Sequence, residues 1–113
     1  MSSDGRGHDT QPLLLGYLHR GLMVTEDQVE AGKQELAMFA RAEGFTMGVI
    51  FVEHAGTWPA AFEALIEAVN RQKVTAVALP SLFHFAAFGV PTDIRDSFER
   101  ATGARVLVIR PVP

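Results

Sequence analysis

Apolar and polar residues follow one another in blocks that predict four strands separated by three main helices. Nearly continuous apolar runs, typical of strands buried on both faces of a sheet, occupy residues 13–18, 45–52, 74–79 and 105–109. The segments between them carry apolar residues three and four positions apart, as on the buried face of a helix. The first helix opens at Thr25, with Gln28 completing a capping box, and closes before Gly44. The second starts at Pro59, and the third covers 91–102.

This alternation of strand and helix indicates an α/β fold. Parallel strands joined by right-handed crossovers place helices on both faces of the sheet, so we expect a three-layer, doubly wound domain. The simplest order for the four strands is 2-1-3-4. We expect residues 1–11, which are polar and rich in glycine and serine, to form a disordered tail, and residues 12–113 to form one domain.

The composition is typical of a globular domain and limits its expected partners and cellular location. Of the 113 residues, 48% are hydrophobic and 20% are charged, and the absence of cysteine excludes disulfides and thiolate metal sites. The net charge is −3 and the ten basic residues are scattered, which disfavours autonomous DNA binding. No apolar run approaches the ~18 residues of a membrane span, and no signal peptide is evident. We therefore expect a cytoplasmic protein with no membrane partner.

Polar residues gather after the first three predicted strands. In open parallel sheets ligands bind beyond the carboxyl ends of the strands, and three of the four histidines fall there. The candidate ligand-binding edge comprises His19, Arg20, Gly21, Glu53, His54, Trp58, Ser81 and His84. Histidine and glutamate are the residue types of a metal or acid–base site, although polar residues also simply mark loops. No close-spaced pair such as His-x-x-x-His supports a metal, so we predict neither a metal nor a cofactor.

The turns after the strands lack the motifs of several enzyme classes. The turn after the first strand has no run of glycines and no Gly-Lys-Ser/Thr ending, and no dinucleotide-binding fingerprint is present. It also lacks the acidic residues that a phosphoacceptor site would need. No Gly-x-Ser-x-Gly elbow surrounds Ser81, whose position after Pro80 suits a turn or a helix cap.

Several short motifs nevertheless occur in a characteristic order. They are Gly16-Tyr17-Leu18-His19-Arg20, Glu43-Gly44-Phe45, Ile50-Phe51-Val52-Glu53, Val77-Ala78-Leu79-Pro80 and Thr102-Gly103-Ala104-Arg105-Val106. In this order and spacing the chain resembles the N-terminal catalytic domain of the resolvase/invertase, or serine recombinase, family over about residues 13–110. The resemblance implies a resolvase-like fold. It also implies a serine after the first strand that attacks a DNA phosphate, with arginines that stabilise the charge.

The positions that would carry this chemistry differ in the present chain. The family's first-strand motif, Gly-Tyr-x-Arg-Val-Ser, has His19 at the arginine position and Gly21 at the position of the nucleophile. Trp58 stands where an arginine usually precedes the second helix. The family pattern Leu-Asp-Arg-Leu-x-Arg after the third strand corresponds to Leu82-Phe83-His84-Phe85-Ala86-Ala87. The aspartate and both arginines are absent, so the resemblance implies a degenerate, catalytically inactive member.

The apolar segment 81–90 suggests a role in protein contact. Its phenylalanines cannot all point inward from one short helix, so we expect an exposed apolar surface. The candidate interface comprises Leu82, Phe83, Phe85 and Phe88, and we expect a homodimer or a complex with another protein. Phe85→Glu should then weaken association without unfolding the chain. The alternatives are packing of this segment as core, a ligand- or metal-binding enzyme or sensor at the histidine-rich edge, and an accessory role in DNA recombination.

Overall fold

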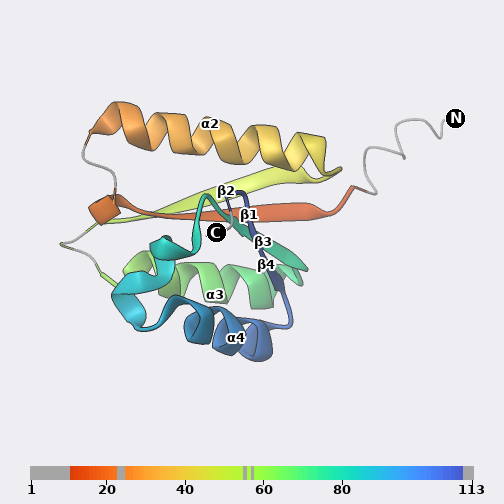
Figure 1. The fold of residues 1–113 in the computed structure, drawn as a ribbon. Helices are drawn as coiled ribbons and strands as arrows, with labels where there is room; N and C mark the ends of the chain where they lie inside the picture. Colours follow the sequence, from red (N-terminus) through yellow and green to blue (C-terminus); the bar gives the residue numbers. More distant parts are fainter. Residues whose placement is uncertain (1–10, 23–24, 55, 57, 111–113) are drawn as a thin grey trace, which may run out of the picture.

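The four predicted strands form one parallel sheet (Figure 1). A computed structural model of the chain describes residues 11–22, 25–54, 56 and 58–110. In these residues the sheet has the order β2-β1-β3-β4. Its strands are β1 (Leu13–His19), β2 (Thr46–Glu53), β3 (Ala76–Leu79) and β4 (Arg105–Val108). The predicted α/β class and strand order are confirmed.

Helices cover both faces of the sheet, which confirms the three-layer arrangement. Helix α2 (Glu26–Ala42) lies on one face, and α3 (Ala60–Gln72) and α4 (Pro91–Thr102) lie on the other (Figure 1). Two 3-10 helices follow the carboxyl ends of strands: η1 (Arg20–Leu22) after β1 and η3 (Leu82–Phe88) after β3. None of the helices in the described residues combines the length and apolar character that a membrane crossing requires.

The core divides into two parts because side chains alternate between the faces of a strand. From β1, Leu14 and Leu18 pack into the cluster beneath α2. Leu15 and Tyr17 from the same strand pack into the larger cluster on the side of α3, α4 and η3, where Phe85 also lies. Both faces of the central strands are therefore buried, as their continuous apolar runs predicted.

The boundaries of the elements differ from the predictions by one or two residues. The capping box at Thr25 is present, since Gln28 N donates to the Thr25 hydroxyl and the Gln28 side chain accepts from Thr25 N. Strand β3 starts at Ala76 rather than Val74, because Val74 N still donates to the carbonyl of Val69 at the end of α3.

Residues 1–10 of the predicted tail, and 111–113 at the end of the predicted domain, lie outside the described residues. Gln11 is described, and its side chain accepts a hydrogen bond of 3.3 Å from the Thr46 hydroxyl.

Candidate functional site

The candidate residues lie where sequence reasoning placed them, at the carboxyl ends of the strands. His19 ends β1, and Glu53 ends β2 as its register partner. Arg20 and Gly21 form part of η1, and His84 lies within η3. In Figure 1 the segments after β1, β2 and β3 meet at one end of the sheet. Whether these residues can bind a ligand depends on where each side chain points and what it contacts.

Glu53 points into the fold and is fully buried. Its Oε1 accepts hydrogen bonds from the Tyr17 hydroxyl (3.0 Å) and from Phe62 N (2.9 Å), and its Oε2 accepts one from Ala61 N (3.1 Å). Because Pro59 at the N-cap of α3 supplies no side-chain cap, the Glu53 carboxylate satisfies the first amides of the helix. Burial, reinforced by Glu53, raises the pKa of Tyr17 well above its usual range. Glu53 therefore stabilises the fold and is not an open ligand.

His84 is also part of the interior. Its Nδ1 accepts a hydrogen bond of 2.8 Å from the backbone amide of His19, and its side chain is buried. Burial, followed by the charges of His19 and Arg110, lowers the pKa of His84 to about 4. The imidazole is neutral at pH 7 and links η3 to the end of β1.

The end of β1 forms a tight local turn. The amide of Gly21 donates to His19 Nδ1 at 3.1 Å, and Nε2 is the other ring nitrogen. That Nε2 atom is buried and has no partner in the described part of the chain, and solvent does not reach it. Arg20 Nη1 lies 3.0 Å from Glu26 Oε2, an ion pair by distance without hydrogen-bond geometry. The Arg20 side chain is thus already paired with Glu26.

The remaining edge residues differ in exposure. His54 is exposed, and Ser81 is half-buried with no capping hydrogen bond from its side chain. Trp58 is 47% exposed and stacks on Phe88, with ring centroids 5.6 Å apart. Among the residues that the structure describes, no three histidine, aspartate or glutamate side chains are grouped to hold a metal ion. The histidines and Glu53 are therefore not assembled as a ligand set.

The candidate interface needs one correction. Phe85 is 0% exposed and belongs to the core, so Phe85→Glu would place a charge in the interior and unfold the chain. Leu82 and Phe88 are partly buried against the same cluster, whereas Phe83 is 53% exposed. The prediction that the phenylalanines do not all point inward is correct, but the exposed one is Phe83.

Four segments at this end of the sheet each carry one large, exposed apolar side chain. We call this group the edge patch; it comprises Leu22, Trp58, Phe83 and Val90. Sequence analysis missed Leu22 and Val90, although large apolar residues in turn segments were a usable signal. The edge thus combines inward-facing polar groups with outward-facing apolar ones.

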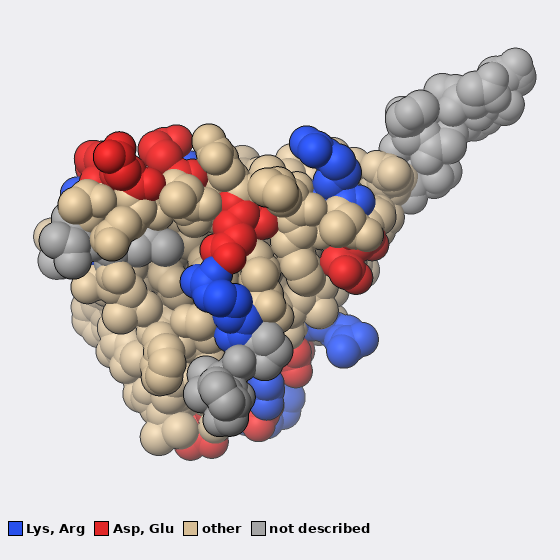
Figure 2. Space-filling view, turned by 45° about the horizontal axis from the view of Figure 1, so that its top comes forward, with Lys and Arg blue, Asp and Glu red and all other residues tan. Residues whose placement is uncertain are grey.

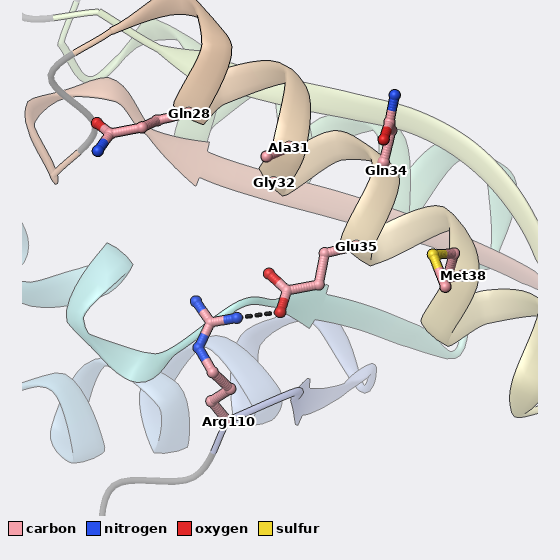
Figure 3. Close-up of a pocket in the computed structure, with 7 residues that line it drawn as sticks. All are labelled: Gln28, Ala31, Gly32, Gln34, Glu35, Met38 and Arg110. Atoms are coloured by element: carbon pink, nitrogen blue, oxygen red, sulfur yellow. Dashed lines mark hydrogen bonds and ion pairs between the residues drawn. The ribbon is translucent and has the colours of Figure 1, made fainter.

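Three cavities bounded by described residues lie elsewhere. One of about 530 Å³ lies between α2 and Arg110, which bonds Glu35 across it (Figure 3). A second, of about 480 Å³, runs along β4 and reaches Leu82. A third, of about 200 Å³ with an almost wholly apolar lining, lies between α3 and α4. None of the three is lined by the edge histidines.

The parallel sheet of order β2-β1-β3-β4, with its helices on both faces, resembles the resolvase catalytic domain. Among solved structures, the chain is similar to the C-terminal catalytic domain of ISC1926 TnpA, an IS607-like serine recombinase. The TM-score is 0.69 at 17% sequence identity, over 86% of this chain and 68% of that chain. At this identity the likeness shows a shared fold. No protein-family model matches the chain, and no curated protein sequence matches it.

Proposed function

We propose that this chain is a non-catalytic domain on a serine-recombinase fold, which binds another protein molecule through the edge patch. The observation that carries the proposal is the division of roles at the carboxyl edge of the sheet. The buried polar groups there, Glu53 and His84, hold neighbouring elements together, while large apolar side chains face solvent.

The residue types at this edge support the absence of recombinase chemistry. In the alignment that the resemblance implies, Gly21 occupies the nucleophile position and has no hydroxyl, so no phosphoserine bond can form there. His84 stands at one arginine position and is neutral at pH 7, since its pKa is about 4. His19, Trp58 and Ala87 stand at the other arginine positions, so the arginines expected to stabilise a phosphate are missing.

The edge patch supports a role in protein binding. Trp58 and Phe83 are each about half exposed, and they project from the segments after β2 and β3, the two strands that flank β1. Exposed aromatic side chains, backed by buried ones, are the usual anchors of protein interfaces. Phe88 lies behind Trp58 in a stacked contact and fixes the position of the indole. A rigid aromatic surface of this kind suits an apolar protein partner better than a phosphate backbone.

Crosslinking at position 83 tests this proposal. A photoreactive phenylalanine analogue replaces Phe83 in cells that contain the chain at its native level. We expect a discrete crosslinked product, and Trp58→Glu in the same chain should abolish it by placing a charge in the patch. A product of twice the chain's mass would identify the partner as a second copy.

The same analogue at Glu67, which is exposed on α3 away from the edge, is the matched control. No product at position 83, or the same product from both positions, would contradict the proposed binding surface.

A further inference from the structure

The outer surface of α2 carries an exposed methionine beside a hollow. Met38 is 65% exposed, the largest value among the large apolar side chains of the described residues. The cavity of about 530 Å³ opens next to it, and the small residues Ala31 and Gly32 form part of its wall (Figure 3). A protruding apolar side chain and a hollow with small walls thus lie on the same face of one helix.

The spacing of these features is self-complementary. Ala31 and Met38 are seven residues apart, which places them on the same face about 10.5 Å apart along the axis. Consider the α2 helices of two copies packed antiparallel, with a two-fold axis that passes between Gln34 and Glu35. In this arrangement Met38 of each copy lies opposite Ala31 of the other. Each methionine then enters the other copy's hollow.

The charges on this face are centred on Gln34, half a residue from that axis. Asp27 and Arg41 lie seven residues on either side of Gln34, and both are exposed. Neither forms an ion pair within the part of the chain that the structure describes. Figure 2 shows acidic side chains gathered at one end of this surface, and a basic side chain with an acidic one near it at the other end. Antiparallel pairing sets Asp27 of each copy beside Arg41 of the other, whereas parallel pairing would set like charges together.

The carboxylate nearest the axis does not oppose this pairing. Glu35 of the two copies would approach one another, but each is already bonded to Arg110 of its own chain (Figure 3). The other acidic residues towards the start of α2, Glu26 and Glu30, are paired with Arg20 and Lys33. The surface therefore brings two unpaired opposite charges together at each end and no unpaired like charges at the centre.

We propose that two copies of this chain associate through antiparallel α2 helices, with Met38 of each copy in the hollow beside Ala31 of the other. This inference goes beyond the proposed function, because α2 is a surface separate from the edge patch. A single helix pair buries little area, so the dimer is weak and depends on concentration.

A charge swap measured by sedimentation equilibrium at low ionic strength tests the pairing. Asp27→Arg alone and Arg41→Asp alone each place like charges together at both ends, so each should weaken self-association at least about tenfold. The double variant, Asp27→Arg with Arg41→Asp, should restore the affinity to within about threefold of the original chain. Met38→Glu should also weaken it, by placing a charge in the hollow.

Glu67→Arg on α3 is the control and should leave association unchanged, since Glu67 lies on the opposite side of the sheet. Circular dichroism melts of each variant check that folding is intact. A chain that stays monomeric throughout the micromolar range would overturn the inference, as would single reversals without effect or a double variant that remains dissociated. None of these outcomes depends on the crosslink at position 83, so the two proposals fail separately.

Discussion

Phe85→Ala should lower the free energy of unfolding by about 3–5 kcal/mol, the cost of removing a large aromatic ring from a packed core. Phe85 is fully buried and touches Tyr17, Phe62 and Phe98, with ring centroids 5.6–6.0 Å apart. These contacts join η3 to β1, α3 and α4, so the cavity left by alanine would loosen four elements. Urea unfolding followed by circular dichroism measures the change.

Phe83→Ala is the matched control, because it removes the same side chain two residues away in the same 3-10 helix. Phe83 is half exposed, and its loss should change the unfolding free energy by no more than about 0.5 kcal/mol. Equal losses for the two variants would show that η3 does not pack in the orientation described.

The second large effect is a loss of stability at acid pH caused by His84. An unfolded histidine titrates near pH 6.5, whereas the folded pKa of His84 is lowered to about 4. The folded state therefore favours the neutral ring. The contribution of His84 to the free energy of unfolding is complete above pH 6.5. It is lost as the pH falls from 6.5 to about 4, by a total of about 3 kcal/mol. Protonation of Nδ1 would also remove the acceptor of the His19 amide.

His84→Asn separates this effect from the titration of the carboxylates. The asparagine oxygen can accept the hydrogen bond from the His19 amide but does not titrate. The free energy of unfolding of both chains is measured from about pH 7.5 to pH 4. As the pH falls, the original chain should lose more of it than the variant does. A difference that is constant over this range would mean that His84 titrates alike in the folded and unfolded states.

The fold could be predicted because its signals are local and repeat along the chain. The period of the apolar residues separated strands from helices, and Thr25 with Gln28 marked the start of α2. The strand order was predicted only as the simplest one for a doubly wound sheet, and the structure confirms it. Only the boundaries moved, where hydrogen bonds such as that of Val74 extend a helix beyond its apolar stripe.

The segment 82–88 shows why the exposed phenylalanine was not predictable. In a 3-10 helix residues three apart share one face, so Leu82, Phe85 and Phe88 point together towards the core. Phe83 is left outside. Four of the seven residues are large and apolar, and the one polar residue, His84, is itself buried. The sequence therefore does not distinguish a three-residue period from one of 3.6 residues. The inward face was fixed by packing against β1 and α3.

The polar residues of the edge were located from the sequence, but their directions were not. Glu53 lies two residues after Phe51, so strand alternation turns both towards the α3 side of the sheet. There it meets a helix whose first residue is preceded by a proline without a capping side chain. Glu53 accepts hydrogen bonds from the first amides of α3 and so has a structural role. This role depends on where α3 packs, which the sequence does not show.

The proposed function requires that the carboxyl edge of this recombinase-like sheet does not bind a DNA phosphate. Its most direct test is a titration of the isotope-labelled chain with a short DNA duplex at low ionic strength, where phosphate contacts are strongest. The measured quantities are the amide chemical shifts of His19–Leu22 and Leu82–Phe88. We expect no saturable change at these amides, while saturable shifts confined to them would contradict the proposed function.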